Sequence, residues 1–250
     1  MEPKDQFLVV EDLVKRYGAE PNATSVLRGV NFSVERGSFV CIMGPSGSGK
    51  STLLHMISGL DEPTSGCVHL AGEQLSKLSL KGRTLLRRRT VGYVFQFFNL
   101  LPNLTVTENV GLPLAIAGQP HQRELEAVPP LLEELGISAR AQAFPHQLSG
   151  GEMQRTSIAR ALAGGQPLLL CDEPTGNLSQ RAGLDVMQAL RHACDEQGRT
   201  VFLVTHNPRD AAFADKVLFL VDGRLDPDHA LHGPGIQSED VHQALTALHI

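Results

Sequence analysis

The chain has 250 residues, a formal net charge of −5 and 42% hydrophobic residues. This length suits one α/β domain with an insert, and the apolar content can build a sizeable core. The negative balance does not favour nucleic acid as a partner. No apolar run reaches the roughly 18 residues that a spanning helix needs. The charged start "MEPKDQ" shows no signal-peptide pattern, so we expect a chain that stays on the cytoplasmic side.

Short apolar runs, often β-branched, recur along the chain and predict strands, because Gly, Pro and polar residues bound them. The later runs lack polar alternation, which is typical of parallel strands buried on both faces. The runs are "FLVVEDL" from Phe7, "VNFSV" from Val30, "SFVCIM" from Ser38, "CVHL" from Cys67, "TVGYVF" from Thr90, "PLLLCDE" from Pro167, "TVFLVT" from Thr200 and "KVLFLVDG" from Lys216.

Helical patterns fill the intervals between these runs. The clearest covers residues 182–197, and its apolar stripe is Leu184, Met187, Leu190 and Cys194, with Gly198 as a C-terminal stop. From about residue 97 to 163 the strand patterns vanish, which predicts a helical insert. Within it, the pair Pro129-Pro130 is expected to start or break a helix.

The end of the chain and its cysteines carry weaker signals. After Gly235, Ser238 is a plausible N-cap, and Val241, Leu245 and Leu248 share one face of a short amphipathic helix. The four cysteines, Cys41, Cys67, Cys171 and Cys194, form no C-x-x-C pair. Because Cys41 and Cys171 lie in apolar runs, we expect buried free thiols in a reducing compartment.

The segment "GPSGSGKS", residues 44–51, matches the phosphate-binding pattern G-x-x-x-x-G-K-[ST] in full. Glycines let backbone N–H groups approach phosphate oxygens, and a helix that begins near Lys50 directs its positive end at the same oxygens. Lys50 adds charge at the β- and γ-phosphates, and the Ser51 hydroxyl can ligate Mg²⁺. The alternative is a Gly-Ser loop that binds nothing.

The run "LLLCDE" supplies two carboxylates at the carboxyl end of a buried strand, where ligands of open α/β sheets bind. Asp172 is suited to hold Mg²⁺, and Glu173 to orient or deprotonate the attacking water. An acidic strand end that only meets solvent is the alternative.

The segment "LSGGEMQR", residues 148–155, places two glycines after Ser149 at a predicted helix start, which makes a second anion-accepting N-terminus. One triphosphate does not need two such sites from one chain. A second copy could therefore bring Ser149, Gly150 and Gly151 against the γ-phosphate that the first copy holds.

With these three motifs in this order, the chain resembles the ATP-binding-cassette (ABC) ATPases from about residue 7 to 225. The resemblance implies an α/β fold: a P-loop NTPase core with a mixed, mostly parallel sheet, an N-terminal antiparallel β subdomain and an α-helical insert. It places the ABC ATPase domain at residues 1–235, with the insert at about 97–163, and a helical tail at 236–250.

The resemblance also implies residue roles. Tyr17 matches the aromatic that stacks on adenine, Gln96 the glutamine that reaches Mg²⁺ and water, and His206 the histidine that contacts the γ-phosphate. A core tyrosine and a structural histidine are the alternatives. The expected metal ligands are Ser51, Gln96 and Asp172, and the expected catalytic residues are Glu173, His206, Gln96 and Lys50. The expected nucleotide contacts are Tyr17, Gly44, Pro45, Ser46, Gly47, Ser48, Gly49, Lys50, Ser51, Thr52, Ser149, Gly150, Gly151 and Glu152.

Two positions depart from the family pattern. Ser179, in "GNLSQ", stands where an Asp commonly ends the loop that crosses the dimer interface, which puts the usual cross-interface contact in doubt. Asn207 follows His206 at a position where Asp is frequent in the family.

Within the family, "RTVGYVFQFFNLLPNLTVTENVGLPLAIAG" resembles the lipoprotein-releasing, macrolide-exporting and cell-division types. Antimicrobial-peptide resistance ATPases share much of this pattern. This implies ATP and Mg²⁺ as cofactors, and a second copy of the chain and an integral membrane permease as partners. A periplasmic adaptor is a further candidate partner, and nucleic acid is not expected.

The permease is expected to contact residues 97–104, because "FFNLL" is apolar for an exposed loop. A local core under the insert is the alternative. The basic run "LLRRRT" is either a solvated helix face or a contact for lipid headgroups or the permease. Two rival classes are a soluble ABC protein acting on DNA or ribosomes and a regulatory module without useful turnover. The first lacks a coiled coil or second cassette here, and only Ser179 favours the second.

Overall fold

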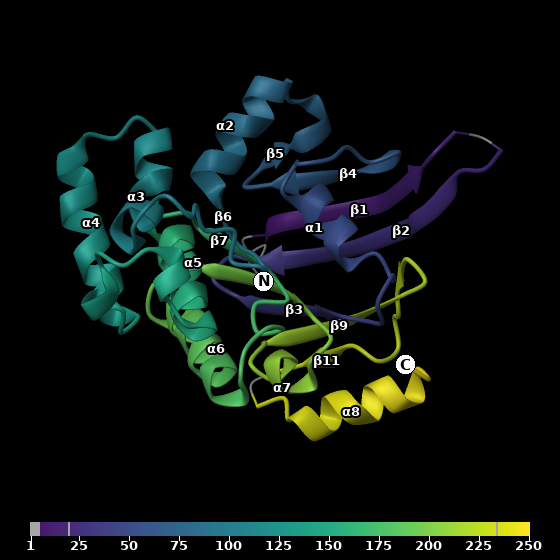
Figure 1. The fold of residues 1–250 in the computed structure, drawn as a ribbon. Helices are drawn as coiled ribbons and strands as arrows, with labels where there is room; N and C mark the ends of the chain where they lie inside the picture. The colour runs from purple at the N-terminus through teal and green to yellow at the C-terminus, as the bar shows by residue number, and fades with distance from the viewer. Residues whose placement is uncertain (1–5, 20, 234) are drawn as a thin grey trace.

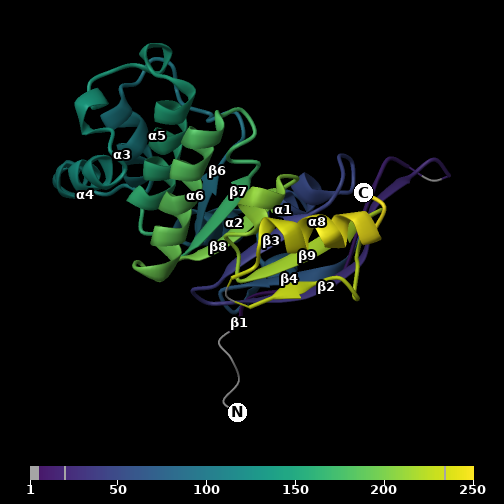
Figure 2. The same cartoon turned by 90° about the horizontal axis from the view of Figure 1, so that it is seen from below.

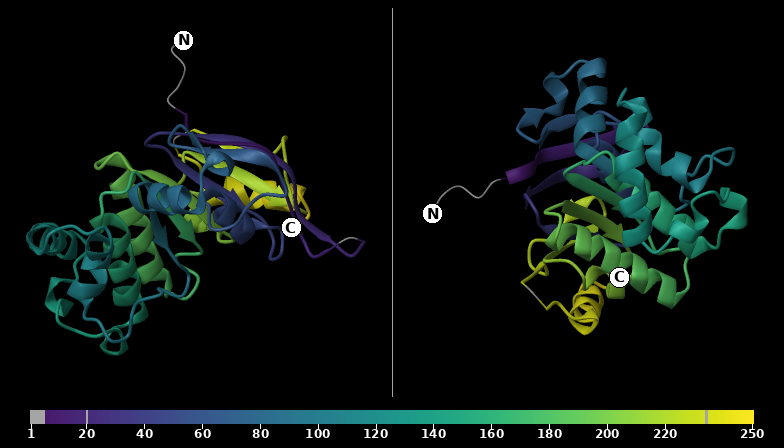
Figure 3. Two further views of the ribbon diagram at one scale, coloured as in Figure 1. Left: turned by 90° about the horizontal axis from the view of Figure 1, so that it is seen from above. Right: turned by 90° about the vertical axis from the view of Figure 1, so that its left-hand side faces the viewer.

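A computed structural model describes residues 6–19, 21–233 and 235–250 of the chain. An α/β core and an all-helical region lie side by side in Figure 1, and the views in Figures 2 and 3 separate them again. The strands are β1 (Gln6–Tyr17), β2 (Thr24–Glu35), β3 (Phe39–Met43), β4 (Ser65–Leu70), β5 (Glu73–Gln74), β6 (Val91–Val94), β7 (Leu168–Asp172), β8 (Thr200–Thr205), β9 (Lys216–Val221), β10 (Arg224–Leu225) and β11 (Leu231–His232). The helices are α1 (Lys50–Ile57), α2 (Leu80–Thr90), α3 (Val106–Ile116), α4 (His121–Glu134), α5 (Gly150–Ala163), α6 (Gln180–Asp195), α7 (Pro208–Ala211) and α8 (Ser238–Ala247), and the 3₁₀ turns are η1 (Leu75–Lys77), η2 (Ser138–Arg140) and η3 (Pro145–Gln147).

Two sheets organise the α/β core. The first is antiparallel, with the order β2-β1-β4-β5. The second has the order β10-β9-β3-β8-β7-β6, in which β9, β3, β8, β7 and β6 run parallel while β10 and β11 pair antiparallel with β9. The predicted fold class, a mixed and mostly parallel sheet with an N-terminal antiparallel sheet and a helical part, is confirmed.

Strand β3 shows why its sequence lacks polar alternation. Every residue of "FVCIM" is buried. Phe39, Cys41 and Met43 pack in one core cluster with the helices, whereas Val40 and Ile42 pack in another with the first sheet and α1. Both faces of the parallel sheet are covered, so both sets of side chains are apolar.

The helical region departs from the sequence prediction at Pro129 and Pro130. We expected this pair to start or break a helix, but α4 continues through both residues. Both prolines are exposed, whereas the preceding Val128 is buried. The carbonyl groups that lose a helical partner therefore lie on the solvent side, where water can satisfy them.

Two smaller expectations also change. Ser238 is the first residue of α8, and Gln237 is its N-cap, because the Asp240 carboxylate accepts from the Gln237 N–H at 2.9 Å. In α6, Leu184 is 49% exposed, and the buried face is instead Gly183, Val186, Met187, Leu190, Ala193 and Cys194. The expected free thiols are confirmed, with Cys41, Cys171 and Cys194 buried and Cys67 half-buried.

The two sheets meet at the turn between β9 and β10. The Arg28 N–H of β2 donates to the Gly223 carbonyl at 2.8 Å, and a Cβ on Gly223 would overlap the Val26 carbonyl oxygen. Gly223 has φ +77°. The turn therefore requires glycine twice over, once for its backbone angle and once for the close approach of β2.

Gly223→Ala is expected to destabilise the chain more than Gly72→Ala. Gly72 occupies the equivalent position of the β4–β5 turn, with φ +81°, but nothing lies within 4 Å of an added Cβ. The control should lose about 1–2 kcal/mol from backbone strain, and Gly223→Ala about 1–3 kcal/mol more from overpacking. Chemical denaturation measures both losses, and equal losses would contradict the close approach.

Candidate nucleotide site

The phosphate loop joins the end of β3 to the start of α1. Pro45, Ser46 and Gly47 are exposed at its rim. A Cβ on Gly44 would overlap the Leu220 carbonyl oxygen, so only glycine fits at this position of the loop. At the N-cap, Gly49 has φ +105° and no side chain to cap α1. The first N–H groups of α1 are therefore available to an anion.

Lys50 lies inside this loop rather than extending into solvent. Its ammonium donates to the carbonyl oxygens of Gly44 at 2.8 Å and Pro45 at 2.9 Å. Burial lowers the pKa of Lys50, and the carboxylates of Glu173 and Asp172 act in the opposite direction. The cation is therefore held by the loop's own carbonyls within the field of both acids.

Ser48 supplies a further sign that the loop fits a ligand. Its hydroxyl oxygen is buried and has no hydrogen-bond partner among the described residues. Buried hydroxyls in native proteins are nearly always paired, so this atom marks a place where a polar ligand group would be accommodated.

Ser51 and Asp172 bring two oxygen ligands together across the site. The Ser51 hydroxyl donates to the Asp172 carboxylate at 3.4 Å, from the first turn of α1 to the end of β7. Burial is the largest cause that raises the pKa of Asp172, and the Ser51 hydrogen bond lowers it. Hydroxyl and carboxylate oxygens are the ligands that Mg²⁺ prefers, so these two side chains fit that ion.

Glu173 and His206 form a contact at the next strand ends. His206 Nδ1 lies 2.8 Å from Glu173 Oε1, and the other carboxylate oxygen lies 3.3 Å from the Thr205 hydroxyl. Glu173 has φ +47°, a left-handed backbone conformation that is uncommon for residues other than glycine. The Glu173 side chain is 13% exposed and that of His206 is 66% exposed. The imidazole is therefore free to meet a ligand, with the carboxylate behind it.

A buried polar network under Glu173 escaped the sequence analysis. The Asp210 carboxylate accepts from the Thr175 hydroxyl, lies 3.5 Å from the Thr205 hydroxyl, and accepts from the Asn207 amide at 3.1 Å. Burial raises the pKa of Asp210. The network ties the turn after Glu173 to the segment after His206. No motif spacing indicates it, because only the fold brings Thr175 and Asp210 together.

Gln96 lies at the junction between the core and the helical region. Its backbone carbonyl accepts from the Asn177 amide at 3.1 Å, and a Cβ on Gly176 would lie 3.2 Å from its side-chain nitrogen. The structure thus places Gln96 beside the turn that follows Glu173.

Tyr17 lies at the end of β1 and is 42% exposed, so it is not a core tyrosine. Its hydroxyl donates to Asp61 at 2.9 Å, and the Lys15 ammonium lies 4.7 Å from the ring centroid. Burial and Asp61 raise the pKa of Tyr17, whereas a hydrogen bond with the Thr52 side chain lowers it. The contact with Thr52 places the exposed ring next to the phosphate loop and α1.

The predicted signature segment begins α5 as expected. Ser149 is its N-cap, and the Glu152 carboxylate accepts from the Ser149 N–H and from the Ser149 hydroxyl, both at 2.8 Å. Arg140 donates to the same carboxylate at 2.8 Å. These bonds lower the pKa of Glu152 to about 2.

The signature and the phosphate loop occupy different parts of the chain. Ser149 is exposed. A Cβ on Gly150 would meet Leu178 at 3.4 Å, and one on Gly151 would meet Ala182 at 3.2 Å. The signature therefore packs beside the loop that precedes α6, while α1 lies elsewhere in the core (Figures 1 and 2).

The two departures from the family pattern have local roles. Ser179 is the N-cap of α6 and accepts from the Ala182 N–H at 3.4 Å, as an Asp would. Asn207 caps α7, where its side chain accepts from the Arg209 N–H at 3.1 Å. Both substitutions preserve a helix start.

Phosphate loop, paired acids and exposed histidine at the carboxyl edge of a parallel sheet define a P-loop ATPase. Comparison with known proteins gives the family: the sequence profile described as ABC transporter matches residues 27–176. A lipoprotein-releasing system ATP-binding protein, LolD 2 of Caulobacter vibrioides, is 48% identical over 223 residues, which cover 89% of this chain and 97% of that protein. The macrolide export ATP-binding/permease protein MacB of Aggregatibacter actinomycetemcomitans is 43% identical over 89% of this chain but only 34% of its own length.

Solved structures agree with this assignment. The ATP-binding cassette MJ0796, as a dimer in a post-hydrolysis state bound to ADP and Pi, matches with a TM-score of 0.80 and 38% identity. The match covers 90% of this chain and 98% of that one. The chain therefore belongs to the ABC transporter family and is an ATP-hydrolysing, ATP-binding subunit homologous to LolD and MacB. Among the described residues, no helix is both long and apolar enough to span a membrane.

Glu152→Gln is expected to flatten the acid limb of the stability curve. A carboxylate with a pKa of about 2 in the folded chain and a usual value of 4.5 stabilises the fold above pH 4.5. That contribution is lost as pH falls from 4.5 towards 2. Glutamine keeps the capping hydrogen bond but cannot titrate. Urea unfolding at several pH values should show that the free energy of unfolding falls less steeply with decreasing pH in the variant. An unchanged pH dependence would contradict the lowered pKa of Glu152.

Proposed function

We propose that two copies of this chain enclose two Mg·ATP, each held by the phosphate loop of one copy and the signature of the other. The observation that carries the proposal is the separation of α5, whose N-cap is Ser149, from α1, which follows the phosphate loop (Figure 1); Ser149 and the rim of the loop are both exposed. Each copy would supply the half of the site that the other lacks. The triphosphate then belongs to the interface, and closure depends on its γ-phosphate.

In this proposal the phosphate loop positions the triphosphate by its backbone N–H groups, and Lys50 exchanges its internal carbonyl partners for phosphate oxygens. Tyr17 offers its exposed ring to the adenine. Ser51 and Asp172 would hold Mg²⁺, together with Gln96. The ion would neutralise charge on the phosphates.

Glu173 and His206 act at the γ-phosphate. Glu173 orients or deprotonates the attacking water, and His206 donates to the γ-phosphate. The 2.8 Å contact between His206 Nδ1 and Glu173 Oε1 supports this assignment. The Glu173 carboxylate can then orient the imidazole and also face the attacking water. Hydrolysis removes the contacts that bridge the two copies, and the dimer opens.

Glu173→Gln should lower the steady-state rate of ATP hydrolysis about a hundredfold or more, because a general base accelerates a reaction on that scale. The variant should still bind ATP and should elute as a dimer with it. The measurements are phosphate release and light scattering after gel filtration. Turnover at the wild-type rate would refute the base assignment.

Lys50→Ala provides the matched control for this variant. Removing a charge-assisted hydrogen-bond donor should weaken ATP binding about tenfold to a hundredfold, so this variant should stay monomeric where Glu173→Gln dimerises. Unchanged ATP affinity would contradict the role of the loop. An ATP-loaded Glu173→Gln chain that stays monomeric would contradict the dimer itself.

We also propose that the dimer drives a membrane permease from the cytoplasmic face, in a lipoprotein-release or macrolide-export type of system. The names of the relatives support a transporter. Two exposed features of this chain support a docking surface: the loop at Phe97 and an arginine-lined cleft nearby.

The loop at Phe97 presents apolar surface in a strained conformation. Phe97 is 71% exposed and Leu101 44% exposed. Phe98 and Asn99 have φ of +59° and +48°, and Arg160 donates to the carbonyl oxygens of both. This exposure favours a partner surface over a local core.

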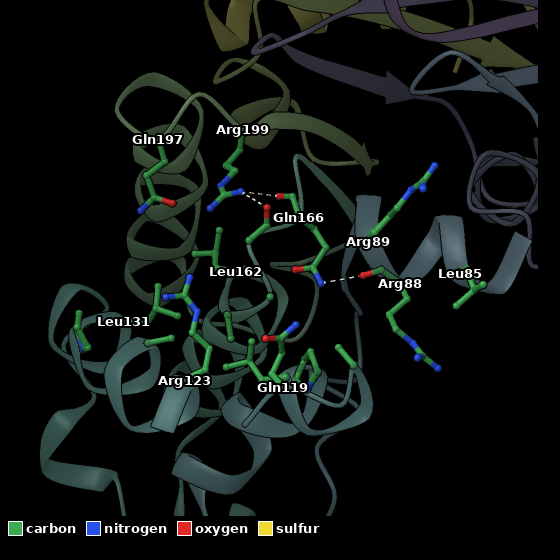
Figure 4. A pocket seen from close by; sticks show the side chains of 18 residues that line it. Leu85, Arg88, Arg89, Gln119, Arg123, Leu131, Leu162, Gln166, Gln197 and Arg199 are labelled. Atoms are coloured by element: carbon green, nitrogen blue, oxygen red, sulfur yellow. Dashed lines mark hydrogen bonds between the residues drawn. The ribbon is translucent and has the colours of Figure 1, made fainter. Parts of the chain in front are cut away.

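A positively charged cleft of about 920 Å³ lies between α2, α4 and the end of α5 (Figure 4). We call it the arginine cleft. Four arginines line it, together with apolar residues such as Leu131 and Leu162. They are Arg88, Arg89, Arg123 and Arg199. Arg89 pairs with Glu73, and among the described residues Arg88 and Arg123 form no ion pair. An acidic, amphipathic segment of the permease would complement this surface, which makes part of the basic run more than a solvated helix face.

Phe97→Ala should weaken permease binding about tenfold while basal hydrolysis by the isolated chain is kept, because an exposed aromatic anchor acts only at the interface. Leu80→Ala is the matched control, since Leu80 is similarly exposed at 76% but starts α2. Affinity for the permease in nanodiscs and phosphate release are the measurements. Equal effects of the two variants would argue against docking at the loop.

A further inference from the structure

Three side chains that favour metal ions gather on the antiparallel sheet, which the proposed reaction uses only at Tyr17. Strands β1 and β4 are antiparallel neighbours (Figure 1), and their register pairs Glu11 with Cys67. On β4, Val68 and Leu70 are buried, so the alternate residues Cys67 and His69 point away from the core. Glu11, Cys67 and His69 therefore share the outer face of the sheet.

The ligand atoms of this cluster are already close. One atom from each side chain can be chosen so that all three lie within 4.8 Å of one another. Cys67 Sγ lies 3.1 Å from Glu11 Oε2 and 3.9 Å from His69 Nε2. In a tetrahedral site with bonds of about 2.0–2.3 Å, ligand atoms lie roughly 3.3–3.8 Å apart. Small side-chain rotations thus suffice to bring all three onto one ion.

The backbone beneath the cluster is held by groups outside it. The β1–β4 register shifts directly after Glu11, and Asp12 has φ +45°. The Asp12 N–H donates to Asn31 Oδ1 at 2.8 Å, and the Asn31 amide donates to Asp12 Oδ1 at 2.9 Å. A Cβ on Gly66 would overlap the Asp12 carbonyl, so β4 approaches the bulge closely. Such a bulge fixes the direction of the side chain next to it.

The donor set indicates which ion fits. A thiol, an imidazole and a carboxylate suit Zn²⁺, whereas Mg²⁺ and Ca²⁺ take oxygen ligands. The Cys67 thiol donates to Glu11, and this hydrogen bond is the main cause that raises the pKa of Cys67. The sulfur is thus already in direct contact, at 3.1 Å, with the carboxylate that would share the ion.

We propose that Glu11, Cys67 and His69 form a binding site for one zinc-class divalent cation, which links β1 to β4. Binding forms a bond from the Cys67 sulfur to the cation and releases the thiol proton to solvent, with no change of oxidation state. Three protein ligands leave the fourth tetrahedral position to water. The cation site shares no residue with the proposed ATP site, so the failure of one proposal would leave the other standing.

Titration of the reduced, nucleotide-free chain with Co²⁺ tests the site, because a thiolate bound to Co²⁺ absorbs in the near ultraviolet. We expect saturation at one Co²⁺ per chain and loss of the band when Zn²⁺ is added. Cys67→Ser should abolish the band, and His69→Gln should weaken binding at least about tenfold. His242→Gln, which removes an exposed histidine of α8, is the matched control and should change nothing.

Two further measurements test whether the cation binds at this cluster. Calorimetry in buffers of different ionisation enthalpy should detect the proton released on Zn²⁺ binding, and Cys67→Ser should lose it. Zn²⁺ should raise the melting temperature of the wild type but not of Cys67→Ser. A cobalt band that survives Cys67→Ser, or no band at all, would overturn the site. So would equal weakening by His69→Gln and His242→Gln.

Discussion

The site depends on the parallel register of three adjacent strands. Strand β8 pairs on one side with β3, where Met43 lies opposite Thr205, and on the other with β7, where Asp172 lies opposite Val204. All three strands thus end at one edge. Lys50, Glu173 and His206 follow these ends closely, so residues far apart in sequence meet without a connection between them. A slip of one residue would turn the acids and the histidine to the wrong faces.

Much of this edge could be predicted from the sequence, because its motifs follow buried strands directly. The phosphate loop, Asp172, Glu173 and His206 each come after an apolar run, and parallel strands align such positions. The network around Asp210 could not be predicted in this way. Thr175 and Asp210 lie on separate loops with no shared spacing, and only the packed fold defines their contact.

Local rules failed where exposure, rather than propensity, decides the outcome. Pro129 and Pro130 break hydrogen bonds of α4, but on its solvent side, so the helix continues. Leu184 fits the apolar period of α6 yet is exposed, because small residues such as Gly183 face the core instead. The cluster at Cys67 was invisible for a different reason: its third member, Glu11, comes from another strand, and only the cross-strand register adds it to Cys67 and His69.

The internal partners of Lys50 have a consequence for the idle subunit. Two of the three N–H groups of the Lys50 ammonium already donate to the Gly44 and Pro45 carbonyls, so a sulfate or free phosphate that takes these two donors must first break existing hydrogen bonds. Only a ligand that binds the N–H groups at the start of α1 and the rest of the phosphate loop at the same time can replace the hydrogen bonds that Lys50 loses. Selectivity for a polyphosphate over simple anions thus begins in the resting cassette, before any second copy arrives.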